Sequence, residues 1–104
     1  MQDLTPTVTV EVAAWVTRLV GGDGTGRRLF DEAVRDGDTV ADVLRRFSAR
    51  FPELDAALWL SGRKELGEHL EVLVDDAALG VSHDLDSLLK GGEQVTILGQ
   101  FMGG

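Results

Sequence analysis

The clearest helix signal in the chain is Asp38-Thr39-Val40-Ala41-Asp42-Val43-Leu44-Arg45-Arg46-Phe47. Thr39 can cap a helix N-terminus, and Asp42, three residues later, can serve as the acid of a capping box. An apolar stripe continues at helical spacing, formed by Val40, Val43, Leu44, Phe47 and Phe51. Pro52 disfavours helical conformation at the residue before it. The segment therefore predicts one main helix that starts at Thr39, ends one or two residues before Pro52, and buries one face.

Two strands are expected before this helix. Valines recur at every second position from Val8 to Val12, and the alternation continues to Val16; a period of two over this length predicts a half-buried strand. The glycine-rich run 21–26 predicts a turn and residues 27–34 a second strand, so that the two strands form a hairpin. The glycine run lacks the Lys-Ser/Thr pair of a phosphate-binding loop and leads into a strand, which argues against nucleotide binding.

Weaker signals follow the helix, and two of them indicate further strands. Residues 53–68 fit a short helix or a packed loop. Residues 70–74 alternate again and predict a third strand, which a turn ends. A very short strand or loop at 77–80 and a single helical turn at 84–89 come next. The last strand is expected over 93–98.

This order of elements predicts an α+β domain. A hairpin followed by a crossover helix requires one sheet with the helix packed on one face. If the first and last strands lie side by side in the centre of the sheet, they run parallel and both are buried. We therefore expect a β-grasp (ubiquitin-like) domain over residues 1–98, with a mixed four- to five-stranded sheet and one main helix on one face. Residues 99–104 would form a flexible C-terminal tail.

The tail ends in two glycines, Gly103 and Gly104, just beyond the expected last strand. A residue without Cβ lets the backbone approach other groups closely. The pair therefore indicates a tail that can enter a narrow cleft of a partner and present its terminal carboxylate there. A frayed end without function is the alternative interpretation.

Composition narrows the function classes. The chain has 104 residues and no cysteine, which argues against a disulfide framework, a thiol nucleophile or a zinc–thiolate site. Its formal net charge of −8 disfavours nucleic-acid binding and favours a partner with a basic docking face. No signal-peptide pattern and no apolar run of membrane-spanning length is apparent, so we expect a cytoplasmic protein without a membrane partner.

The chain resembles the ThiS/MoaD family of sulfur-carrier proteins over nearly its whole length. The most specific matches are residues 38–44 at the helix start and 88–98 before the tail, and residues 70–76 look like the family's third strand and its turn. The terminal Gly103-Gly104 matches the diglycine of the family. Family tails often carry a proline-containing run of small residues before the glycines, whereas this chain has Gly99-Gln100-Phe101-Met102, which leaves the pathway open.

The resemblance implies a carrier that performs no catalysis and binds no cofactor or metal. An E1-like adenylyltransferase/sulfurtransferase of the ThiF/MoeB type would use ATP to adenylate the carboxylate of Gly104. A sulfur donor would then replace AMP and leave a thiocarboxylate. A sulfur-accepting biosynthetic enzyme would consume it, and molybdopterin, thiazole, cysteine or another metabolite would be a compatible destination.

Docking of these partners is expected on exposed apolar groups of the free face of the sheet. Leu98 and Phe101 are the main candidates, with Trp15 and Phe30 behind them. Met102 would supply an adaptable contact within the tail.

Two other function classes remain open from the sequence. A ubiquitin-like modifier would use the same activated Gly104, which a lysine amine would then capture in an isopeptide bond. A β-grasp interaction domain without carrier function would make the glycine ending incidental. The histidines His69 and His83, with nearby carboxylates and no cysteine, form too weak a pattern for a metal site.

Overall fold

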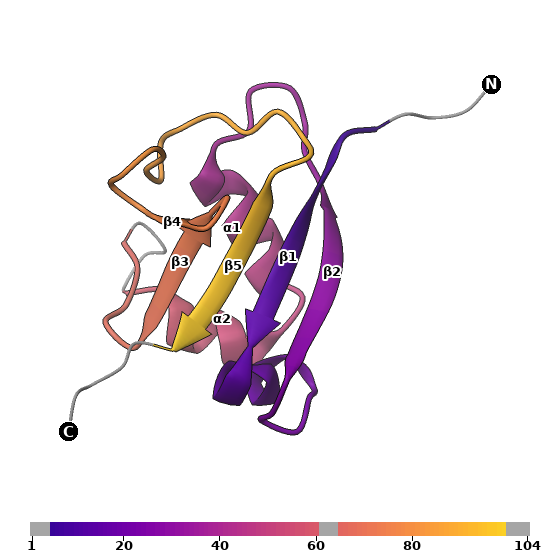
Figure 1. Cartoon of the computed structure of the whole chain (residues 1–104), viewed down its shortest axis with the longest axis vertical. Coiled ribbons are helices and arrows are strands. Elements are labelled where there is room, and N and C mark those ends of the chain that lie inside the picture. The colour runs from indigo at the N-terminus through magenta and orange to yellow at the C-terminus, as the bar shows by residue number, and fades with distance from the viewer. Residues whose placement is uncertain (1–4, 61–64, 100–104) are drawn as a thin grey trace.

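The computed structural model describes residues 5–60 and 65–99 of the chain. Within these residues, one mixed five-stranded sheet in the order β2-β1-β5-β3-β4 carries α1 and α2 on one face (Figure 1). The strands are β1 (Thr7–Ala13), β2 (Arg27–Ala33), β3 (Leu70–Val74), β4 (Ala77–Ala78) and β5 (Gln94–Gly99). The helices are the 3-10 helix η1 (Ala14–Val20) and the α-helices α1 (Val40–Ser48) and α2 (Pro52–Leu58).

The first and last strands lie side by side in the centre of the sheet. β1 and β5 run parallel, with Val10 opposite Val95 and Val12 opposite Ile97. β2 flanks them antiparallel on one side and β3 antiparallel on the other. The side chains of the central pair, Val10, Val12, Val95 and Ile97, are fully buried against the helices. The β-grasp arrangement predicted from the sequence is confirmed, including its parallel central pair.

The main helix forms as its sequence predicts at the start and ends slightly earlier. The Thr39 hydroxyl accepts from the Asp42 amide at 3.1 Å, and the Asp42 carboxylate accepts from the Thr39 amide at 3.0 Å, which completes the capping box. α1 ends at Ser48 rather than near Phe51. Phe51 has extended backbone angles, as a residue before proline prefers, and it starts the separate helix α2.

The first strand is shorter than its alternation predicts. β1 stops at Ala13, and Ala14 then adopts a left-handed φ of +57°, which turns the chain into η1. Val16, expected on the strand, is buried from the helix instead, together with Val20 one turn later. The prediction was wrong here because Val16 satisfies both the period of two and the helical spacing to Val20.

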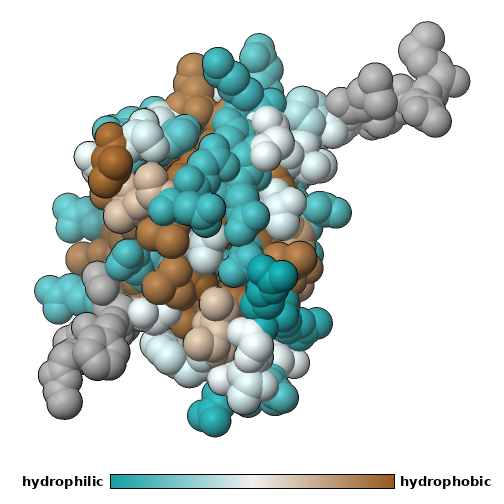
Figure 2. Space-filling view, viewed as in Figure 1, coloured by the Kyte–Doolittle hydropathy of each residue, from teal (hydrophilic) through white to brown (hydrophobic). Residues whose placement is uncertain are grey.

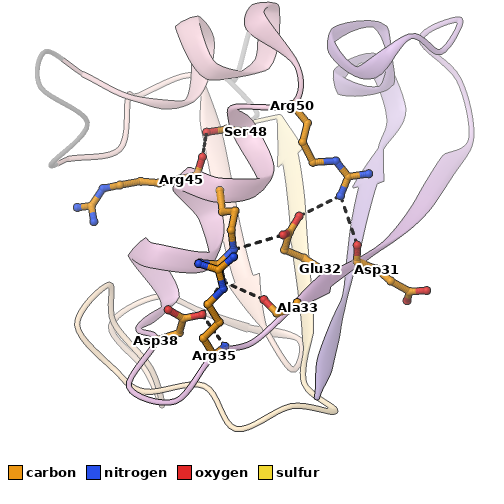
Figure 3. A network of polar contacts seen from close by, with 9 residues as sticks. Asp31, Glu32, Ala33, Arg35, Asp38, Arg45, Ser48 and Arg50 are labelled. Carbon is orange, nitrogen blue, oxygen red and sulfur yellow. Dashed lines mark hydrogen bonds and ion pairs between the residues drawn. The ribbon is translucent and has the colours of Figure 1, made fainter. Parts of the chain in front are cut away.

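Arg46 of α1 and Arg50, two residues after its end, connect the helix to the edge strand β2 (Figure 3). The Arg46 guanidinium donates to the Asp38 carboxylate at 2.5 Å and to the Ala33 carbonyl at 2.9 Å. Arg50 donates to the Glu32 carboxylate at 2.9 Å and more weakly to the Asp31 carbonyl at 3.3 Å. Unpaired carbonyls on an edge strand invite pairing with another chain, and these contacts cover two of them.

A buried polar contact connects α2 and the residue after it to α1. The indole Nε1 of Trp59 donates to the Ser48 hydroxyl at 3.0 Å, and this hydroxyl donates to Asp55 at 2.6 Å. The predicted helical turn at 84–89 is only a turn, closed by a 3.1 Å bond from the Ser87 amide to the Asp84 carbonyl.

Candidate functional site

The candidate site lies at the C-terminal end of β5, where the predicted tail begins. Gly99, which the sequence analysis assigned to the tail, is the last residue of β5 and pairs with Leu70 of β3. The root of the tail is therefore held by β3, at the end of a central strand whose residues up to Ile97 also pair with β1. The tail residues singled out from the sequence lie outside the described residues: Phe101, Met102, Gly103 and Gly104.

Side chains alternate along β5, and the alternation sorts the predicted docking residues. Val95 and Ile97 face the helices and are fully buried. Leu98 points to the opposite, free face of the sheet, where it is half-buried and lies opposite Glu71 of β3. Its placement on the free face agrees with the expectation, while its contact with a partner stays a prediction.

The free face combines apolar and polar groups. Figure 2 looks onto this face, and apolar atoms gather on it over the C-terminal half of β5 and the adjacent β3. Leu73 lies there on β3, two residues after Glu71, the partner of Leu98, so Leu73 and Leu98 are diagonal neighbours. Leu29 of β2 lies opposite Glu11, and 56% of its surface is exposed. Between them, Gln94 donates to the Glu11 carboxylate at 3.1 Å. Sequence reasoning missed both leucines, although each occupies an outward position of its strand.

Phe30 does not lie on the free face, contrary to the expectation. It is opposite Val10, whose side chain points to the helices. Its ring meets Phe47 and Phe51 edge-on, with ring centroids 5.2 and 5.3 Å apart, and the Arg50 guanidinium lies 5.6 Å from its centroid. Phe30 therefore closes the core at the sheet edge and is covered by a cation on its outer side.

Trp15 also lies on the helical side of the sheet. It belongs to η1, and its indole sits against Gly99. A Cβ at Gly99 would point to the same side as Val95 and Ile97, and it would come within 2.7 Å of the indole Cε2. The ring thus occupies the space that a side chain at position 99 would need, while 45% of the Trp15 surface stays exposed.

The described residues offer neither a metal site nor a membrane-spanning helix. Within residues 5–60 and 65–99, no group of three or more histidine and carboxylate side chains is arranged to hold a metal ion. No helix in the same part of the chain has the length and apolar character needed to cross a membrane.

Comparison with solved structures gives proteins of one fold, and they match almost end to end. The small archaeal modifier protein 1 (SAMP1) from Methanosarcina acetivorans is 22% identical, with 94% of this chain and 98% of that chain covered and a TM-score of 0.66. Urm1 from Trypanosoma brucei is 19% identical over 99% and 100% of the two chains, with a TM-score of 0.71. A chain of the Amycolatopsis orientalis BexX/CysO complex is 24% identical over 91% and 99%, with a TM-score of 0.65.

This chain has the ubiquitin-like fold of the ThiS/MoaD type. No protein-family model and no curated protein matches the sequence. At identities below 25% the likeness establishes the fold, and the predicted resemblance is confirmed at that level.

In this ubiquitin-like protein, the end of β5 combines an exposed apolar surface with a backbone that the sheet holds in place at Gly99. Leu98 presents an apolar group on the free face, and Trp15 closes the helical side of Gly99. Such an arrangement can hold a partner against the free face at the end of β5.

Proposed function

We propose that the protein is a sulfur carrier whose reactive group is the α-carboxylate of Gly104. An E1-like enzyme of the ThiF/MoeB type joins this carboxylate to the α-phosphorus of ATP and releases pyrophosphate. Sulfide from a donor then attacks the acyl carbon, and AMP leaves with its phosphate oxygen. The product is a C-terminal thiocarboxylate, which a biosynthetic enzyme accepts as its sulfur source. The carrier itself contributes no catalytic residue.

The observation that carries this proposal is the end of the central strand at Gly99. Because β5 pairs with strands on both sides, the body of the protein holds the root of the tail in place. The five residues from 100 to 104 can span at most about 17 Å when extended. That reach lets the carboxylate enter an active-site cleft while the folded body stays outside it.

Two further features support a protein partner. The CysO chain of similar fold was solved in complex with BexX, so this fold can dock another protein. The net charge of −8 favours an activating enzyme with a basic face around its cleft. Because the first step consumes ATP, we expect the reaction in the cytoplasm.

Intact-protein mass spectrometry tests the proposal. The purified chain is incubated with ATP, sulfide and a ThiF/MoeB-type enzyme from the same organism. We expect a mass gain equal to one exchange of oxygen for sulfur, and an AMP adduct when sulfide is omitted. The activity of the enzyme is first verified on a carrier that it is known to activate. If the mass of this chain then never changes with the same enzyme, the proposal is contradicted.

Removal of Gly104 gives the matched variant for this test. Deletion of Gly104 should abolish both mass changes, because the carboxylate then ends one residue short of the catalytic groups. The melting temperature should stay within about 1 °C, since the change lies five residues beyond the last strand. Normal activation of the truncated chain would show that Gly104 is not the reacting residue.

The name of SAMP1 favours a second candidate function. That protein of similar fold is called a modifier, and the same adenylated Gly104 would make this chain a modifier if a lysine amine displaced AMP. Digestion of cell extract followed by peptide mass spectrometry distinguishes the two. A carrier yields free thiocarboxylate, whereas a modifier yields tryptic peptides in which a lysine carries residues 91–104 of this chain, because Lys90 is the last tryptic cleavage site.

A further inference from the structure

A strained corner follows β1 and determines where Trp15 lies. Ala14 has a φ of +57°, in the left-handed region that a residue with a Cβ rarely adopts. Such a conformation persists when the surroundings fix it from several sides. Here the Ala14 amide donates to the Gly26 carbonyl at 2.8 Å, and its carbonyl accepts from the Thr17 hydroxyl, also at 2.8 Å. Thr17 is fully buried, so this corner is held rigidly.

The corner delivers the Trp15 ring to the last residue of the central strand. The ring lies beside Gly99 on the helical side, so close that a Cβ at position 99 would overlap the indole Nε1 and come within 3.0 Å of Cζ2. The contact therefore requires glycine at one position and a corner with positive φ next to the other. Core packing alone does not explain it, because the ring remains 45% exposed.

We propose that Trp15 is a positioning residue for the activation of the C-terminus, an inference that rests on the proposed sulfur-carrier function. The indole closes the helical side of Gly99 and fixes the direction in which the backbone leaves the sheet. The free face, where Leu98 lies, is then the open side of Gly99 for a partner that docks at the end of β5. Trp15 acts through Gly99 and does not touch the reacting carboxylate.

The expected effect is on the binding of the carrier by its activating enzyme. Fixing the backbone of one residue costs about 1–2 kcal/mol of conformational entropy when the partner must do it. Without the ring, pairing with Leu70 still holds one side of Gly99, but its helical side is open and the enzyme has to complete the ordering of the strand end. The KM for the carrier should therefore rise about 5- to 30-fold, while kcat at saturating carrier stays within about twofold.

Adenylation kinetics with three variants test this role. Trp15→Ala should show the rise in KM, and Trp15→Phe, which keeps an aromatic ring at the corner, should recover part of it. Leu88→Ala removes a similarly exposed apolar side chain beside the start of α1 and should leave both constants unchanged. An unchanged KM in Trp15→Ala, or a loss confined to kcat, would overturn the positioning role.

A double-mutant cycle measures the contact without any enzyme. Gly99→Ala should destabilise the wild-type protein, because its Cβ overlaps the indole, and it should cost clearly less in the Trp15→Ala background. Additive effects would mean that the contact does not exist in solution and would overturn the inference. Coupled effects with an unchanged KM would reduce Trp15 to a structural role. A wild-type chain that is never adenylated would overturn the proposed function, and the positioning role with it.

Discussion

At the scale of single residues, Ala14 is the position where sequence and conformation disagree most. A residue with a Cβ in the left-handed region costs about 1–2 kcal/mol, whereas glycine adopts this region freely. Glycine also makes the unfolded chain more flexible, which costs about 0.5–1 kcal/mol. Ala14→Gly should therefore raise the free energy of unfolding by up to about 1 kcal/mol in urea denaturation.

The neighbouring Ala13 provides the control for this substitution. Ala13 ends β1 with ordinary extended angles, so Ala13→Gly should lower the free energy of unfolding. Equal destabilisation by the two changes would show that Ala14 carries no strain in solution.

The same residue explains which part of the candidate site sequence reasoning could not find. The placement of Leu98 follows from the alternation of side chains along one strand, and a local pattern predicts it. The position of Trp15 depends on the left-handed conformation of Ala14, and an alanine in the sequence does not indicate a positive φ as a glycine would. Phe30 was misplaced because only the register of β2 against β1 decides which face its side chain takes.

At the scale of elements, the contact between α1 and the Asp38 loop makes stability depend on pH. Burial of the Asp38 carboxyl would raise its pKa, but hydrogen bonds from the Arg46 side chain and the Arg35 amide outweigh it, so that the pKa lies below its usual value. A carboxyl whose pKa is lowered in the folded state stabilises the fold when the pH is above the pKa of this group in the unfolded chain, about 3.9. That contribution is lost as the pH falls further, through the folded pKa.

Asp38→Asn should therefore reduce the loss of stability that the protein shows as the pH falls into the acid range. Thermal unfolding followed by circular dichroism from about pH 6 to about pH 3 should show a smaller decrease for the variant than for the wild type. At neutral pH the variant should be less stable by about 1–3 kcal/mol, because it loses a charge-assisted hydrogen bond to Arg46. The exposed neighbour Asp36→Asn is the matched control, and identical slopes for wild type and Asp38→Asn would contradict this account.

Elements whose signals are local were predicted well, and elements that depend on tertiary context were not. The start of α1 follows from a capping box within four residues, so Thr39 and Asp42 were sufficient to find it. Residues 14–20 carry a spacing that fits both strand and helix, and packing against β5 and α2 selected the helix. The sequence fits either a short helix or a packed loop in the region of α2, because the first turn of this helix is marked mainly by Pro52.

At the scale of the whole molecule, the net charge of −8 predicts how fast an activating enzyme finds the carrier. Attraction between an acidic carrier and a basic docking face raises the association rate and is screened by salt. We expect the association rate constant to fall about tenfold between roughly 50 mM and 500 mM NaCl, with a much smaller change in the dissociation rate. Stopped-flow mixing at several salt concentrations measures both constants, and a salt-independent association rate would show that charge does not guide the encounter.

The architecture could be predicted as a whole because one arrangement satisfies all its parts. A hairpin, a crossover helix and two later strands leave few ways to bury both runs of alternating valines and isoleucine. The identity of the partners could not be predicted in the same way, because it depends on the outer surface of the sheet and on the chain beyond Gly99.

The adjacency of β1 and β5 also matters during synthesis of the protein. β5 joins the β1–β2 hairpin to the β3–β4 pair, so neither half has a complete sheet before residue 99 has left the ribosome. A nascent chain interrupted earlier exposes unpaired valine-rich edges to chaperones and proteases. Quality control in the cell would thus remove incomplete chains that lack β5, the strand that leads into the tail.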